Sequence, residues 1–249
     1  MDLQVRDDVL QVAAPGARWL STGWNGGYRD ADAAYNISVP TGWDRTDLTE
    51  YVRERRTDAG FTEDGPALLT GVEMRHAAGA RLGPVWAIAT VGLSNPASLP
   101  LDPASEGPGA GVDSGSPTDP TSNDPADSDP GPEVGTVNVV LGTDRALDDA
   151  SLATLLGVVV ESKTATLLQR TGFTGTTSDA AIVGSNPAGE PREFAGSATE
   201  IGGAARAAVR DAVLAAAASR YDGSDSIPAS VADADSGIET TRRATVFRP

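Results

Sequence analysis

The sequence contains no cysteine and only one histidine among its 249 residues. Without cysteine there is no disulfide framework, no thiolate metal site and no thiol nucleophile. A zinc site of the HExxH type needs two histidines and is excluded as well. A Ser-His-Asp triad has only His76 to use, and a lone histidine near a strand end is more often structural, so its role stays open. Hydroxyl, amine and carboxylate chemistry remains.

Lysine is almost absent: Lys163 is the only one, and the other 18 basic residues are arginines. Acidic residues outnumber basic residues by 35 to 19, a formal net charge of −16. This balance argues against nucleic acids and anionic membranes as partners, because both bind basic surfaces. It resembles the composition of proteins from salt-loving archaea, in which salt screens surface repulsion. A lysine retained inside an apolar helix is therefore a candidate for chemistry.

Long apolar runs are missing too. No run approaches the roughly 18 residues of a membrane span, and the acidic start lacks the apolar core of a signal peptide. We therefore expect a cytoplasmic protein. Residues 100–134 have almost no apolar side chains, so they cannot bury enough surface to offset their chain entropy. The sequence predicts one catalytic domain, formed by residues 1–99 and 135–221. A disordered acidic insertion is predicted at 100–134 and a flexible tail at 222–249.

The order of the expected elements indicates the fold class. Apolar periodicity and turn residues predict a hairpin at 3–12, strands at 33–40, 66–74, 84–93 and 136–141, a short helix at 47–58, and long helices at about 148–171 and 198–220. Short connections in the first half favour antiparallel pairing, and the second half reads strand, helix, strand, helix. We predict a single α+β domain. Its mixed, largely antiparallel sheet is covered by the two long helices and is α/β-like in the C-terminal half.

A glycine-rich loop follows a strand that ends near Leu20, and it reads Ser-Thr-Gly-Trp-Asn-Gly-Gly at 21–27. Glycine lets the backbone approach a ligand closely, and Trp24 can lie against a flat apolar group. We expect this loop to bind substrate. The alternative is an ordinary glycine turn that closes a hairpin.

The long helix contains Glu-Ser-Lys-Thr at 161–164. Lys163 continues the spacing of Leu156 and Val159, so it prolongs the apolar face. Glu161 lies on nearly the opposite side of the helix. Because most of the helix is apolar, we expect the helix to be buried between layers and Glu161 to be buried with it. The two residues cannot face each other. Either they flank one pocket, or one of them is structural: a salt-bridged lysine, or a glutamate hydrogen-bonded to a loop.

Polar residues also accompany the strands around this helix. The loop before the next strand contains Thr176 and Thr177 and one carboxylate, Asp179. It suits a polar ligand or the orientation of a lysine. Asn138 interrupts a strand and Asn95 follows another, and both side-chain amides can pair with an amide-rich ligand.

Six motifs, in this order along the chain, resemble one family. They are Ser-Thr-Gly-Trp-Asn-Gly-Gly at 21–27, Gly-Leu-Ser-Asn at 92–95, Gly-Thr-Val-Asn at 135–138, Glu-Ser-Lys-Thr at 161–164, Thr-Thr-Ser-Asp-Ala at 176–180 and Phe-Ala-Gly at 194–196. Together they resemble the adenosylcobinamide amidohydrolases, archaeal enzymes that salvage incomplete corrinoids. The likeness covers nearly all of the chain that is expected to be ordered. The family usually reads Glu-Ala-Lys-Thr where this chain has Ser162, and the insertion departs from its compact members.

The resemblance implies hydrolysis of the amide that joins the aminopropanol arm to the corrin ring of adenosylcobinamide, giving adenosylcobyric acid for cobamide salvage. The corrinoid is then the substrate, and neither a cofactor nor a metal is expected. Two other interpretations remain: a corrinoid-binding or carrier protein that does no chemistry, and an amidase for another amide-rich substrate. The sequence leaves the oligomeric state open, a homodimer included.

Amide hydrolysis requires an activated nucleophile, stabilisation of the oxyanion and protonation of the leaving amine. With a thiol excluded, a hydroxyl or a water activated by a lysine or carboxylate remains. We assign Lys163 or Glu161 as the base and Asp179 as an orienting group or second acid. Backbone N–H groups of Gly26 and Gly27 are the expected oxyanion donors. The residues expected to bind substrate are Ser21, Thr22, Trp24, Asn25, Gly26, Gly27, Asn95, Asn138, Thr176 and Thr177.

Overall fold

The computed structural model describes residues 1–40, 42–102, 135–222, 227–234 and 236–249. The insertion predicted at 100–134 therefore lies almost entirely outside the described residues. The helices are α1 (Leu48–Asp58), α2 (Asp149–Thr171) and α3 (Glu200–Arg220), with 3-10 turns η1 (Met74–His76) and η2 (Val231–Asp233). The strands are β1 (Asp2–Arg6), β2 (Val9–Ser21), β3 (Gly27–Ser38), β4 (Ala67–Thr70), β5 (Ala78–Leu82), β6 (Val85–Val91), β7 (Pro96–Ser98), β8 (Val137–Thr143), β9 (Gly175–Thr176), β10 (Ala180–Ser185) and β11 (Ile238–Glu239).

One large sheet joins most of these strands in the order β4-β3-β2-β10-β8-β6-β5, with β1 paired to β2. β3 and β4 are parallel, as are β8 and β10, and the other neighbours are antiparallel. The predicted α+β domain with a mixed, largely antiparallel sheet is confirmed. A smaller sheet has the order β11-β7-β9, so the tail contributes a short strand that pairs with β7.

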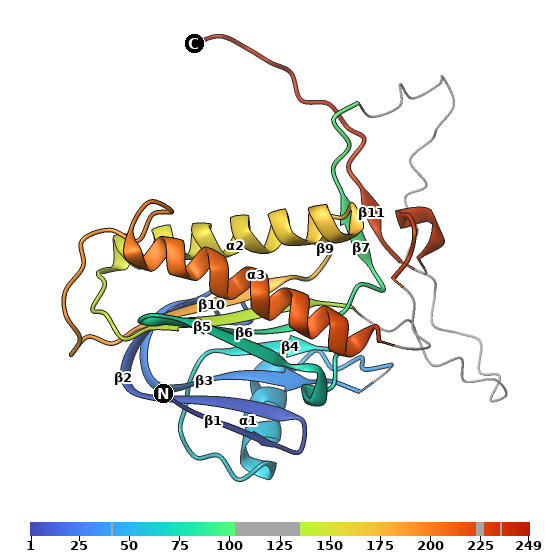
Figure 1. The fold of residues 1–249 in the computed structure, drawn as a ribbon. Coiled ribbons are helices and arrows are strands. Elements are labelled where there is room, and N and C mark those ends of the chain that lie inside the picture. The colour runs from blue at the N-terminus through green and yellow to red at the C-terminus, as the bar shows by residue number, and fades with distance from the viewer. Residues whose placement is uncertain (41, 103–134, 223–226, 235) are drawn as a thin grey trace, which may run out of the picture.

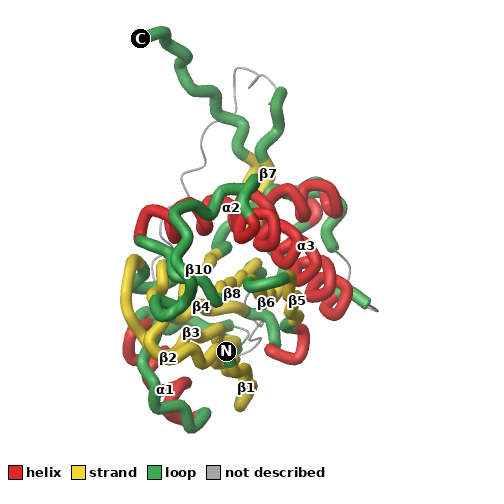
Figure 2. The backbone as a smooth tube through the Cα atoms, turned by 60° about the vertical axis from the view of Figure 1, so that its left-hand side comes forward, coloured by secondary structure: helices red, strands yellow, loops and turns green. Residues whose placement is uncertain are grey.

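The two long helices, α2 and α3, lie side by side over one face of the sheet (Figures 1 and 2). Alternation along β8 divides its side chains between two cores. Val139 and Leu141 pack in the core that both helices share, whereas Val140 packs with Trp19 and Trp86 on the other face. The sheet curls around this second core, so that β4 lies against β8 although the two are not neighbours in the sheet. α1 lies on the side away from α2 and α3 (Figure 1).

The limits of α2 follow from its sequence. Asp148 caps the first turn by accepting the N–H of Ser151 at 2.7 Å. This N–H and the Ser151 hydroxyl hold the pKa of Asp148 below its ordinary value. Gly172 ends the helix with φ of 84°, a conformation that costs glycine little because it has no Cβ. The predicted bounds are confirmed, and β8, α2 and β10 form a unit of two parallel strands joined by a helix.

Two predicted strands differ from the structure in extent. The run at 66–74 forms only the four-residue β4, because the hydroxyl of Thr70 accepts the N–H of Val72 and turns the chain away from the sheet. Conversely, β2 runs without a break for 13 residues. The expected hairpin at 3–12 and the expected strand that ends near Leu20 therefore share one continuous strand, and a register shift between Ala13 and Ala17 accommodates Pro15 and Gly16.

The predicted burial of α2 between two layers is wrong. Val160 and Leu168 are 45% and 49% exposed, because the sheet and α3 cover only one side of the helix. By length and composition alone, α2 is apolar enough to cross a membrane. Its other side is buried in the core shared with the sheet, which is typical of the core helix of a globular domain.

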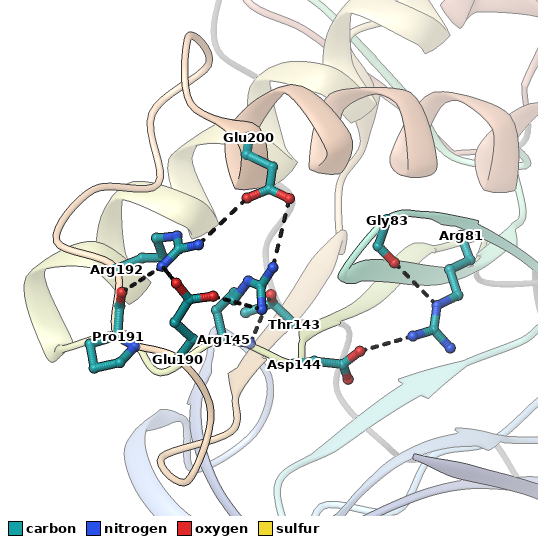
Figure 3. Close-up of polar contacts among 9 residues, drawn as sticks. All are labelled: Arg81, Gly83, Thr143, Asp144, Arg145, Glu190, Pro191, Arg192 and Glu200. Carbon is teal, nitrogen blue, oxygen red and sulfur yellow. Dashed lines mark hydrogen bonds and ion pairs between the residues drawn. The ribbon is translucent and has the colours of Figure 1, made fainter.

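Arginines and acids form a network beyond the carboxyl ends of β8 and β10 (Figure 3). Arg145 contacts Glu190 at 3.2 Å and Glu200 at 3.8 Å. Arg192 contacts the same two acids at 2.7 and 3.9 Å. Because Glu200 belongs to the first turn of α3, the network fastens the loop after β10 to that helix. Two guanidinium groups face two carboxylates, so the charges balance.

Replacing Gly142 of β8 tests the packing beneath the sheet. A Cβ at this position would lie 2.1 Å from the buried ring of Trp86. We expect Gly142→Ala to lower the free energy of unfolding by about 1–3 kcal/mol through overpacking. Gly157, inside α2, has open space around its Cβ position, so Gly157→Ala should raise the free energy by about 0.5–1 kcal/mol. Chemical denaturation at constant salt measures both. A shift of the same sign in the two variants would contradict this packing.

Candidate functional site

Three polar loops meet at the end of the sheet opposite the network of Figure 3. The carboxyl end of β6 and the amino ends of β8 and β10 share this end, because β6 is antiparallel to β8 and β8 is parallel to β10. Asn95, beyond β6, donates its side-chain amide to the hydroxyl of Thr177 at 2.6 Å. The hydroxyls of Thr136, before β8, and Ser178, before β10, are hydrogen-bonded at 2.8 Å. The sheet thereby unites motifs that are far apart in the sequence.

Lys163 and Asp179 form an ion pair within this cluster, with side chains only 11% and 13% exposed. Asp179 also accepts the backbone N–H of Val137 at 2.9 Å, the N–H of Thr176 at 3.1 Å and the Thr176 hydroxyl. A carboxylate offers about four acceptor positions, and these four donors fill them. The prediction that this loop carries a carboxylate suited to orienting a lysine agrees with the observed contact.

Lys163 reaches the carboxylate because of where α2 places it. It lies on the buried side of α2 with Leu155 and Val159, which confirms that it prolongs the apolar face. The ammonium extends past Gly175, where a Cβ would lie 2.2 Å from Asp179 Oδ2 and 3.0 Å from Lys163 Nζ. Any side chain at position 175 would therefore occupy the space that the ion pair fills.

Glu161 lies apart from this cluster. Its side chain is 57% exposed and pairs with Arg206 of α3, so the prediction that Glu161 is buried is wrong. Glu161 is exposed because it lies on a side of α2 that the sheet does not cover, and among the described residues its only ion pair there is with Arg206 of α3. The helical spacing did place Glu161 and Lys163 on different sides, and this is confirmed.

Asn138 takes part in a second, fully buried polar group on the other face of the sheet. Its side-chain amide donates to Asn36 Oδ1 and to the carbonyl of Leu69, both at 2.9 Å. Asn36 in turn donates to the hydroxyl of Thr90 at 3.0 Å. Asn138 Oδ1 and Asn95 Oδ1 are buried without a hydrogen-bond partner. Sequence reasoning missed Asn36, although it interrupts an apolar strand as Asn138 does.

The loop between β2 and β3 connects this cluster to the protein surface. Ser21 pairs with Ile182 of β10. The Thr22 backbone N–H donates to the Ala181 carbonyl, and the Thr22 hydroxyl accepts the Ala181 N–H, both at 2.9 Å. Ser21 and Thr22 therefore lie beside the segment that holds Asp179.

The rest of that loop faces α1. Trp24 is half exposed and donates its indole N–H to the hydroxyl of Thr49 at 3.0 Å. Asn25 has φ of 50°, and a Cβ on Gly26 would lie 2.3 Å from the Ser21 carbonyl. Gly27 pairs with Ser21 at the start of β3. The turn that closes the hairpin explains both glycines, so their role as oxyanion donors stays a prediction.

His76 lies in the 3-10 turn η1, outside the cluster, with Nδ1 3.0 Å from the hydroxyl of Ser219 in α3. In the part of the chain that the structure describes, no three His, Asp or Glu side chains are grouped to hold a metal ion. Thr136 and Ser178, which sequence reasoning did not include among the site residues, do belong to the cluster. Their signal was their place in two of the quoted motifs.

Fold and site define a single-domain α+β protein with a polar, ion-paired cluster at one end of a mixed sheet. A family model described as adenosylcobinamide amidohydrolase matches residues 2–225. A protein of Halobacterium salinarum named adenosylcobinamide amidohydrolase is 50% identical over 247 residues, covering 98% of each chain. A protein of the same name from Methanosarcina mazei is 25% identical over 212 residues, covering 81% of this chain and 90% of its own length. The chain belongs to the adenosylcobinamide amidohydrolase family.

Breaking the two ion pairs of α2 should have very different effects. Lys163→Met leaves the carboxylate of Asp179 buried without its counter-charge, so we expect the free energy of unfolding to fall by about 3–5 kcal/mol. Arg206→Met breaks the exposed pair with Glu161 and should cost less than about 1 kcal/mol. Denaturation curves of both variants, at the same salt concentration, make the comparison. Equal losses would show that the Lys163 pair is not the buried anchor described above.

Proposed function

We propose that this protein hydrolyses the amide bond between the aminopropanol arm and the corrin ring of adenosylcobinamide, giving adenosylcobyric acid. Membership of the family supports the substrate class. The observation that carries the chemistry is the hydrogen-bonded series Thr176, Asp179 and Lys163. A hydroxyl bonded to a carboxylate, which a third group orients, is the arrangement that activates oxygen nucleophiles in hydrolases.

In this mechanism the Thr176 oxygen attacks the amide carbonyl carbon while its proton passes to Asp179. The tetrahedral intermediate collapses when the C–N bond breaks, and the leaving amine takes that proton. Water then hydrolyses the acyl ester on Thr176, with Asp179 accepting a proton from the water and returning one to the Thr176 oxygen. Lys163 compensates the charge of the carboxylate, and the N–H of Val137 fixes its position. The net reaction consumes one water.

This assignment gives Lys163 the role of an ammonium that orients Asp179 rather than that of a base. Glu161 is too far around α2 to take part, because it points to the exposed side. Thr176 is 8% exposed, and its neighbours Thr177 and Ser178 are exposed, so the loop reaches the protein surface. We also propose that the reaction needs neither a cofactor nor a metal, and that the enzyme acts in the cytoplasm.

Incubation of the purified protein with adenosylcobinamide, at high salt, tests the activity. We expect release of aminopropanol together with a corrinoid carboxylic acid, and the same rate after treatment with a chelator. Tight binding without release would support a carrier protein instead. Neither binding nor release would point to another amide-rich substrate, and loss of activity with the chelator would overturn the metal-free mechanism.

The role of Thr176 is tested by two matched substitutions. Thr176→Val keeps the shape of the side chain and removes the hydroxyl, so we expect kcat to fall by about 10²–10⁴-fold. Thr176→Ser keeps the hydroxyl and should retain most of the activity. Thermal unfolding of both variants controls for loss of the bond to Asp179. Full turnover by a folded Thr176→Val variant would transfer the attack to a bound water.

A further inference from the structure

The side of α2 that points away from the sheet is a long face without charge. Its spacing of four, three, four and four positions forms one stripe along the helix: Ala153, Gly157, Val160, Thr164 and Leu168. Thr164 is half-buried and the other four are exposed. We call this stripe the outer face of α2. Among the described residues, the sheet and α3 pack only against other sides of the helix. With 23 residues, α2 is about 34 Å long, so the open face is extensive.

An exposed aromatic residue lies beside the start of this helix. The hydroxyl of Ser151, in the first turn, donates to the carbonyl of Glu193 at 2.8 Å, and the loop between β10 and α3 lies next to that turn (Figure 1). The following residue, Phe194, is 71% exposed. It begins the motif at 194–196, which the catalytic cluster at the opposite end of the sheet does not use. Exposed apolar side chains gathered in this way are typical of protein interfaces.

The residues of the outer face are small in its first half and larger in its second half. If two copies of α2 pack antiparallel, Ala153 of one copy faces Leu168 of the other, and Gly157 faces Thr164. Both pairs meet in one register, because both are centred between residues 160 and 161. Small residues opposite larger ones let two helices fill the space between them. A two-fold axis near Val160 makes the face complementary to itself.

The charges at the two ends of α2 favour the same arrangement. Asp148 and Asp149 lie at its start. Arg18 contacts Asp149 at 3.0 Å, but the Asp149 side chain stays 54% exposed. Arg170 lies in the last turn, and it has no ion-pair partner among the described residues. Antiparallel packing places Arg170 of each copy beside the acidic start of the other, whereas parallel packing would bring like charges together.

We propose that two copies of this chain form a dimer through the outer faces of α2, packed antiparallel about an axis near Val160. The one acid at the edge of the face, Glu161, is compensated by its pair with Arg206, so the two copies meet there without net repulsion. Contact between apolar faces does not depend on charges that salt would screen. It therefore suits a chain whose composition is typical of proteins that function at high salt.

Analytical ultracentrifugation at high salt tests the dimer. We expect the wild type to sediment with twice the mass of one chain. Val160→Glu places two carboxylates close to the axis and should raise the dissociation constant of the dimer by about 100-fold or more. Val5 of β1 is 53% exposed and Val160 is 45% exposed, so Val5→Glu is a matched control that should stay dimeric. Thermal unfolding checks that both variants are folded. A monomeric wild type, or an unchanged dissociation constant in folded Val160→Glu, would overturn the proposal.

Disulfide formation reports the register, because the chain itself contains no cysteine. Oxidation of a mixture of Gly157→Cys and Thr164→Cys should link the two variants, since these positions face each other between copies. Neither variant should link to itself, because equivalent positions lie about 10 Å apart along the helix, beyond the reach of a disulfide. Links within one variant, without links in the mixture, would contradict the antiparallel register.

A membrane surface is the competing use of an apolar helix face, and the same variants separate it from a dimer. Phosphatidylcholine vesicles are mixed with the wild type and with Val160→Glu, and bound protein is measured by co-sedimentation. We expect neither protein to bind. A monomeric wild type that binds the vesicles, together with loss of binding in Val160→Glu, would assign the outer face to lipid and overturn the dimer.

Discussion

The ion pair between Lys163 and Asp179 is the contact that holds the site together. It joins α2 to the loop before β10, and through the N–H of Val137 it also joins β8. Burying two charges costs several kcal/mol per ion unless other hydrogen bonds satisfy them. Three additional donors on Asp179 meet that requirement. The carboxylate is therefore fixed in one position, and the Thr176 hydroxyl is fixed with it.

The same contact accounts for the single lysine of the chain. A guanidinium is broad, planar and has five N–H donors. Asp179 already accepts three hydrogen bonds from other groups, and the space beside Gly175 is too narrow even for a Cβ. A compact ammonium on an extended chain fits this place, and an arginine does not.

Helical and strand periodicity in the sequence correctly predicted the elements whose limits depend on neighbouring residues. The β8–α2–β10 unit, the caps of α2 and the buried side of Lys163 follow from helical and strand periodicity, and the structure confirms them. Periodicity does not say which elements cover a helix, so Glu161 was expected to be buried although it is exposed. It also does not reveal the curl of the sheet. Because that curl sets β3 and β4 against β8, the contact of Asn36 with Asn138 could not be read from the sequence.

At high salt, the charged groups of this chain attract or repel each other only when they are in direct contact. The composition is typical of proteins that function at high salt, where charges separated by more than a few ångströms are screened. Exposed pairs such as Arg81 with Asp144 then add little to stability. A charge can still act if burial keeps salt away from it, as at Lys163. The chemistry proposed for the cluster therefore depends on a positive group that is buried in direct contact with its carboxylate, not on the acidic surface.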